Sequence, residues 1–197
     1  MTGVVPPEAR AILDFWFGAP GSADYGRQRT LWFRKRADTD RTLRARFGAL
    51  TDAAVAGALR EWEATPHGAL ARILLLDQFT RNIHRNTPQA FAGDTLALDA
   101  ACRLIDSGAL QPLIPVERAF VFMPFEHAED LACQDRAVAL FEDLAREHPD
   151  CDGMLDYARR HREVIARFGR FPHRNVILGR ESTAAESTYL AEPGSGF

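Results

Sequence analysis

The sequence predicts an all-α protein, and three observations support that prediction. Apolar residues recur every three to five positions along most of the chain, which is the period of amphipathic helices. Apart from 175–178, which could be briefly extended, no stretch shows the alternation typical of a strand. Proline and glycine divide the chain into segments of helical length. Because 197 residues can bury one substantial core, we expect a single helical domain over 1–197, with about eight to ten helices and flexible termini at 1–6 and 192–197.

The N-terminal third is expected to contain three helices. Prolines at 6 and 7 favour a helix start, and the helix is expected to stop at Gly18. A short helix should hold Trp32 and Phe33. Residues 38–58 should form a surface helix, broken near Thr51, because their apolar positions are widely spaced.

The stretch 69–86 is the expected centre of the fold. Thr65 and Pro66 are a strong start signal, with threonine as N-cap and proline as the first helical residue. Residues 69–76 are apolar on nearly every side apart from Arg72, so this helix should be surrounded by others. Its second half is suddenly polar, with Asp77, Gln78, Arg81, Asn82, His84 and Arg85.

The second half of the chain repeats these signals. A helix should follow Thr87 and Pro88 and end by Phe91 or, after a break at Gly93, continue through 96–105. Residues 116–123 should be helical until Pro124 breaks or restarts the chain.

The last long helices are expected from 131 to near 148–149 and over 154–168, with Gly169 as a left-handed C-cap of the second. Thr183 and Glu186 form a capping box that starts a final short helix.

Composition excludes several classes of protein. The formal charge of −3 leaves no basic excess for nucleic acid, and no apolar run reaches membrane-spanning length. Cys102, Cys133 and Cys151 are an odd, widely spaced set without a CxxC motif, which favours buried thiols in a reducing compartment. We therefore expect a cytoplasmic protein that binds neither nucleic acid nor membrane; the sequence does not specify its oligomeric state.

Three polar clusters are the candidate functional positions. The first is the polar half of the central helix. The second cluster follows Pro124 and consists of Glu126, His127, Glu129 and Asp130. The third surrounds the turn after 168 and consists of Arg167, Arg170, His173, Arg174 and Asn175. Acid–histidine pairs suit acid–base chemistry, and arginine clusters suit anions. The alternative is structural, because acids at helix starts and cations at helix ends complement the helix dipole. The clusters are also complementary in charge, so they could pair with one another.

Metal and cofactor sites are not expected. Glu126, His127, His161 and His173 could supply metal ligands, but no HExxH-type spacing is present. No nucleophile elbow, Walker loop or dinucleotide glycine pattern occurs, so we expect no cofactor.

The polar motifs DQFTRN, MPFEHAED and RFGRFPHRN, together with LDFWFG near the N-terminus, resemble those of the domain-of-unknown-function 924 family. The resemblance extends from the first helix to the last. It implies a tetratricopeptide-repeat-like array of antiparallel helices, and its motifs fall on the same three clusters. One departure is Thr80, where the family usually has proline, which leaves the local helix geometry open. The resemblance implies no activity.

Two functions remain open from the sequence. One is a binding module for a small anion or a peptide carboxylate, with the ligand-binding residues Gln78, Arg81, Asn82, Arg170, Arg174 and Asn175. The alternative is an enzyme of hydrolase type, with Asp77 or Glu126 as general base and His127 or His173 as acid or base. The binding module would have the clusters lining a concave groove, and the enzyme requires them to converge on a solvent-reachable cavity.

Overall fold

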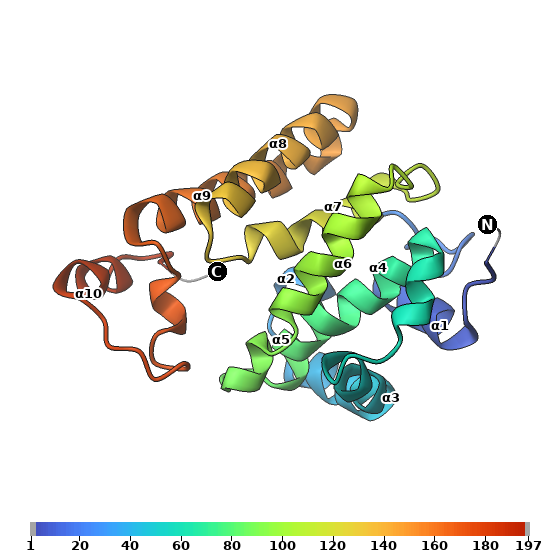
Figure 1. The fold of residues 1–197 in the computed structure, drawn as a ribbon, viewed down its shortest axis with the longest axis horizontal. Helices are drawn as coiled ribbons and strands as arrows, with labels where there is room; N and C mark the ends of the chain where they lie inside the picture. The colour runs from blue at the N-terminus through green and yellow to red at the C-terminus, as the bar shows by residue number, and fades with distance from the viewer. Residues whose placement is uncertain (1–2, 196–197) are drawn as a thin grey trace.

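The computed structural model describes residues 3–195, and every regular element within that range is a helix (Figure 1). The all-α prediction is therefore confirmed. The parts of the expected flexible termini at 1–2 and 196–197 lie outside the described residues.

The α-helices begin and end close to the expected positions. In chain order they are α1 (Pro7–Phe17), α2 (Thr30–Phe33), α3 (Ala37–Val55), α4 (Pro66–Leu74), α5 (Thr80–Ile83), α6 (Asp94–Asp106), α7 (Pro115–Glu126), α8 (Leu131–Glu147), α9 (Asp152–Phe168) and α10 (Ala184–Leu190). Short helices of other types are η1 (Arg60–Ala64), the π-helical η2 (Leu75–Phe79), η3 (Pro88–Phe91), η4 (Pro149–Cys151) and η5 (Pro172–Arg174).

Local capping follows the sequence signals. The Thr65 hydroxyl accepts from Gly68 N at 3.1 Å, Gly169 adopts the left-handed conformation with φ of 69°, and Thr183 and Glu186 form the expected capping box.

Two expectations about secondary structure were wrong. Helix α3 is unbroken at Thr51, whose hydroxyl donates to Phe47 O within the helix. Residues 175–178 form turns, because Asn175 continues η5 and the backbone folds back on itself.

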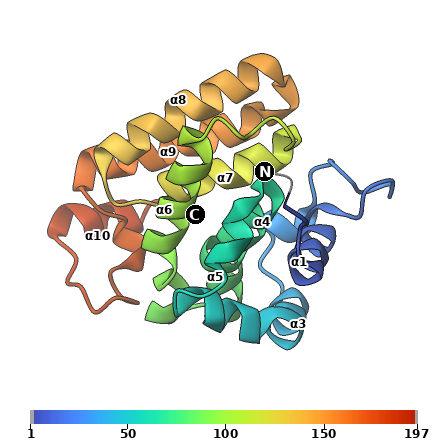
Figure 2. The same cartoon turned by 45° about the vertical axis from the view of Figure 1, so that its right-hand side comes forward.

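Helix α4 lies at the centre, in contact with α1, α6 and α7 (Figures 1 and 2). Helices α8 and α9 form a long antiparallel pair that packs on α7, away from α1 and α3, and α10 lies beyond them. The tetratricopeptide-like stacking of such pairs stays a prediction.

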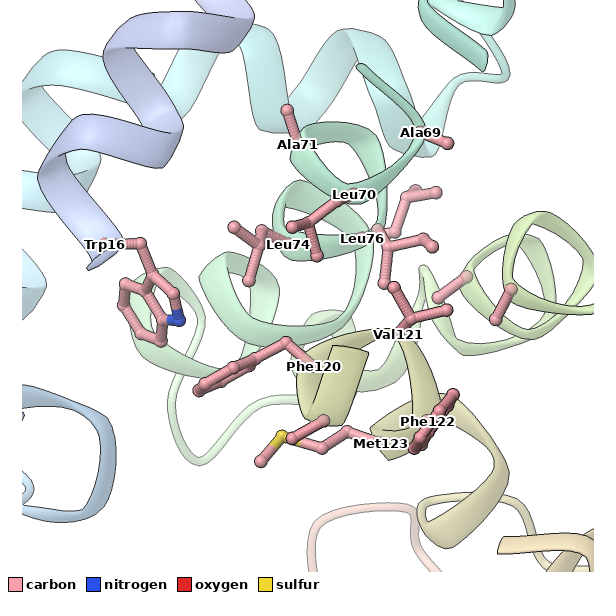
Figure 3. Close-up of a cluster of buried hydrophobic side chains, with 14 of the residues drawn as sticks. Trp16, Ala69, Leu70, Ala71, Leu74, Leu76, Phe120, Val121, Phe122 and Met123 are labelled. Carbon is pink, nitrogen blue, oxygen red and sulfur yellow. The ribbon is translucent and has the colours of Figure 1, made fainter. Parts of the chain in front are cut away.

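The central helix is buried on all sides, as its composition indicates. Residues 68–74 are all buried, and Leu70 and Leu74 extend toward Trp16 and Phe120 (Figure 3). Arg72, the polar exception, donates to Glu63 at 2.6 Å and to Ala58 O. A buried charge in that position is stable because it is paired.

The thiols differ from the expectation of burial. Cys151 is buried, whereas Cys102 and Cys133 are partly exposed, and all three are free. Among the described residues, no helix combines the length and the apolar character needed to cross a bilayer.

Helix α6 begins directly against η2, which continues the central helix after α4, because Gly93 lacks a side chain. A Cβ at Gly93 would lie 2.2 Å from Leu76 O, which belongs to the rigid backbone of η2. This close approach places Asp94, the first residue of α6, beside the polar end of the central helix.

Gly93→Ala should therefore lower the free energy of unfolding by about 1–3 kcal/mol, since overpacking forces the two helices apart. Chemical denaturation measures this change. Gly48→Ala is the matched control: it lies within α3, a Cβ there meets only Arg44 Cγ at 3.9 Å, and alanine should stabilise the helix by up to about 1 kcal/mol. Equal effects of the two substitutions would contradict the steric explanation.

Candidate functional site

Side chains from all three sequence clusters meet where the central helix, α6, α7, α9 and η5 come together. We call this set the polar junction. Its residues are Asp77, Arg81, Asp94, Glu126, His127, His161 and Arg174.

The junction starts at a π-helical turn in the central helix. The backbone N–H of Thr80 bonds to Leu75 O, one residue further back than in an α-helix. The carbonyl of Leu76 then accepts from the Thr80 hydroxyl at 2.7 Å. The side chains of Arg81 and Asn82 likewise donate to Asp77 O and Gln78 O. Thr80 thus supplies two donors to this turn, its backbone N–H and its hydroxyl. π-turns of this kind are frequent at functional sites.

The Asp77 carboxylate lies inside this turn and is 1% exposed. It accepts from Gln78 Nε2 at 2.7 Å, lies 2.7 Å from His127 Nδ1, and is 3.1 Å from Arg81 Nη1. Although burial opposes ionisation, Arg81 and His127 hold the pKa of Asp77 far below its usual range. Burial also lowers the pKa of His127, against the opposing effect of Asp77. The pair is therefore an ionised aspartate and a neutral histidine.

Arg81 connects the central helix to α6. Its guanidinium forms a bidentate pair with Asp94, at 2.8 and 3.0 Å. Burial disfavours its charge, but Asp77 and Asp94 more than offset that effect and raise the pKa of Arg81. The position of Asp94, which Gly93 fixes, is what makes the pairing possible. Sequence reasoning missed Asp94 because it interpreted Gly93 only as a helix break.

Arg174 brings η5 into the junction. It is 6% exposed, its Nη2 donates to His127 O at 3.0 Å, and its Nη1 lies 3.5 Å from Asp94. Its guanidinium packs 4.8 Å from the ring centre of Phe91 and 4.5 Å from that of Phe171. Within residues 3–195, its Nε has no hydrogen-bond partner. Burial and the nearby Arg81 lower the pKa of Arg174 to about 10.

Glu126 and His161 form the deepest part of the junction. Both residues are 5% exposed, and His161 Nδ1 lies 3.0 Å from Glu126 Oε1. Burial, with a contribution from Asp77, raises the pKa of Glu126 to about 8. Burial also holds the pKa of His161 well below its usual value, and the neighbouring His127 adds to that effect. At neutral pH this contact therefore joins two neutral groups.

The surroundings of Glu126 differ from the sequence expectation. Pro124 lies inside α7, which continues to Glu126, so Glu126 ends one helix instead of starting the next. Carbonyls at that end, which lack an intrahelical partner, accept from Gln134 Nε2, with Glu126 O at 2.6 Å and Ala128 O at 2.8 Å. Asp130 caps α8 by accepting from Cys133 N, as the structural alternative predicted for an acid at a helix start.

Glu129, Arg170 and Asn175 lie in a separate C-terminal network. Arg180 forms a bidentate pair with Glu129, at 2.6 and 2.9 Å, and donates to Asn175 Oδ1. Arg170 forms a bidentate pair with Glu186. The structure thus separates Arg170 and Asn175 from the other expected ligand-binding residues. Arg180 carried no sequence signal, because it lies in a loop outside the motifs.

The remaining candidates lie beside the junction. Gln78 and Asn82 are partly buried, and their side chains stabilise the π-turn: Gln78 Nε2 contacts Asp77 and Met123, and Asn82 accepts from Arg85.

The His173 ring packs 5.6 Å from that of Phe171. Burial, reinforced by Arg174, lowers the pKa of His173 to about 4.

The junction is partly open to solvent. The side chains of His127, Arg81 and Asp94 are 15, 19 and 23% exposed. Two hollows, of about 470 and 220 Å³, lie elsewhere, beside Phe15 and beside Phe168. A ligand of the junction would therefore contact this rim.

A family model described as "Bacterial protein of unknown function (DUF924)" matches residues 12–194. The chain belongs to this family. A solved structure, "Structure of Protein of Unknown Function ATU0120 from Agrobacterium tumefaciens", is 39% identical and superimposes with a TM-score of 0.81, covering 93% of this chain and 96% of that chain. No curated protein matches the chain.

Membership of DUF924 confirms the resemblance that the polar motifs indicated. It brings no activity or ligand with it, so the polar junction of this DUF924 chain has to be interpreted from its own chemistry.

The Glu126 carboxyl should make stability depend on pH. Its pKa rises from 4.5 to about 8 on folding, so between these values the folded state keeps a proton that the unfolded state has lost. Stability from this group is complete below pH 4.5 and is lost as the pH rises toward 8. Glu126→Gln keeps a neutral side chain at every pH. Relative to wild type, it should gain roughly 1 kcal/mol in free energy of unfolding per pH unit between pH 5 and 8.

Urea denaturation of both metal-free proteins at several pH values measures this difference. The other titrating groups occur in both chains and cancel in the comparison. A difference that does not change with pH would contradict the assignment.

Proposed function

We propose that this protein binds a small anionic ligand, a carboxylate or a phosphate, at Arg174 and Arg81. The observation that carries the proposal is the state of Arg174: a buried guanidinium with an unpartnered Nε within residues 3–195 and an Asp94 contact of 3.5 Å. Buried charges are normally paired closely, so this cation is under-compensated.

The neighbouring charges support an incoming anion. Asp94 already gives its two short contacts to Arg81, so it cannot fully compensate Arg174 as well. Arg81 lies over the same Phe91 ring, at 5.6 Å, and lowers the pKa of Arg174. An oxyanion between the two guanidinium groups would relieve their repulsion and accept the Nε–H. A tetratricopeptide-like stack of the helix pairs would present this position on a concave face.

Arg174→Gln should weaken anion binding at least tenfold, because a hydrogen bond to a charged group contributes about 1.5–3 kcal/mol. Calorimetric titration of metal-free protein with inorganic phosphate, succinate and a short peptide measures the affinity, and an amidated peptide shows whether a terminal carboxylate is recognised. Arg174→Lys keeps the charge but not the planar fork, and should retain part of the affinity.

Arg162→Gln is the control for a lost positive charge, since Arg162 pairs with Asp135 on the surface. It should bind as wild type does. If Arg170→Gln abolishes binding and Arg174→Gln does not, the ligand lies at the C-terminal network and the proposal is wrong.

The Asp77–His127 contact favours acid–base catalysis as the second candidate function. The Asp77 carboxylate can only accept, so its 2.7 Å contact assigns the proton to His127 Nδ1 and leaves the lone pair on Nε2. A neutral, partly exposed imidazole oriented by a buried aspartate is a competent general base. Arg81 would stabilise a developing negative charge.

This alternative predicts that His127→Gln lowers any hydrolysis of p-nitrophenyl esters and phosphates by about 10²–10⁴-fold. Because burial lowers the pKa of His127 from its usual value, the wild-type rate should start to fall at a lower pH than the rate of an enzyme with an unperturbed histidine base. Stopped assays at several pH values test both points. Equal rates for wild type and His127→Gln would exclude His127 as the catalytic base.

A further inference from the structure

Three potential metal ligands meet at the deep side of the polar junction. Glu126 and His127 end α7, and His161 comes from the middle of α9. One ligand atom from each residue lies within 4.8 Å of the other two. Glu126 and His161 are buried, and the His127 side chain is 15% exposed, so the group has one side toward the rim.

Each histidine is held through Nδ1 by an acceptor. Asp77 Oδ1 lies 2.7 Å from His127 Nδ1, and Tyr157 O lies 2.9 Å from His161 Nδ1. Since a carboxylate only accepts, Nδ1 of His127 carries the proton and its Nε2 carries the lone pair. Nδ1 of His161 lies near two oxygens, Tyr157 O and, at 3.0 Å, Glu126 Oε1. Histidines that bind metals are oriented in this way by an outer carboxylate or carbonyl.

The charges around Glu126 also differ from those elsewhere in the site. Asp77 and Asp94 pair with Arg81, and Glu129 pairs with Arg180. Within residues 3–195, Glu126 has no arginine or lysine partner, and its contact with His161 joins two neutral groups. A buried carboxyl without an arginine or lysine partner either stays protonated or receives a cation from solution.

We propose that Glu126, His127 and His161 bind a divalent transition-metal ion, with Asp77 as the outer partner that orients His127. Two imidazoles and one carboxylate match zinc, which takes three protein ligands and leaves a fourth position for water or substrate. Magnesium and calcium prefer oxygen ligands throughout, so they fit this set poorly. The site is independent of the anion-binding proposal, because it uses no contact of Arg174.

Histidine ring NMR of the untagged, metal-stripped chain tests the site directly. The chain has six histidines, and Zn²⁺ is added alone, up to one equivalent. Ring ¹⁵N signals of His127 and His161 should move to the values of metal-coordinated imidazole, while those of His67 and His148 stay unchanged. Absence of saturable binding, or coordination by His67 or His148 instead, would overturn the proposal.

Substitutions test the two proposed roles separately, Glu126 as a metal ligand and Asp77 as the outer partner that orients His127. Glu126→Gln should reduce Zn²⁺ affinity at least tenfold by calorimetry, and Asp77→Asn should reduce it by about 10–100-fold. His148→Gln, at the end of α8, should bind as wild type does. Thermal unfolding without metal first establishes that each variant folds. A folded Glu126→Gln protein with wild-type Zn²⁺ affinity would exclude Glu126 as a ligand. If a variant does not fold, the NMR titration of the wild-type chain still shows whether His127 and His161 coordinate Zn²⁺.

Discussion

The buried, ionised carboxylate of Asp77 is the constraint around which the polar half of this protein is arranged. A charge at 1% exposure costs several kcal/mol unless donors surround it. Those donors come from Gln78 and Arg81 on the same helix and from His127 at the end of α7. Arg81 in turn holds Asp94 on α6. One acid thereby determines how three helices meet at the end of an otherwise apolar core.

The polar junction has two electrostatic halves that share His127. Behind the rim, Arg174 lies 3.5 Å from the Asp94 carboxylate, and its Nε has no hydrogen-bond partner within residues 3–195, so its charge favours binding of an anion. On the deep side, Glu126 has neutral histidine neighbours and no arginine contact within residues 3–195. This part of the junction therefore favours binding of a cation. The same sequence segment, the end of α7, serves both halves: the carbonyl of His127 accepts from Arg174, and its ring lies near His161. The two proposals therefore concern different atoms.

Most of the fold was predictable because its signals are local. Helix starts at Pro66 and Thr183 and the stop at Gly169 depend on capping chemistry within one turn. The signals failed where a distant contact overrides a local preference. Pro124 favours a break, yet α7 continues for two residues because Gln134 from α8 satisfies the carbonyls at its end. The π-turn at Leu75–Phe79 leaves no sequence mark that a search for helical periods would detect.

The sequence by itself determined the helical class, the buried central rod and the chemical types of the site: acids and histidine after Pro124, and arginines around Gly169. Tertiary structure decided which of them meet. Arg174 joins Asp94 and His127, whereas Arg170, four residues earlier, turns to Glu186. His161 joins Glu126 from a helix that begins well after α7 ends. The physical reason is that charge pairing acts over a few ångströms of space, and local sequence does not specify which side chains reach that distance.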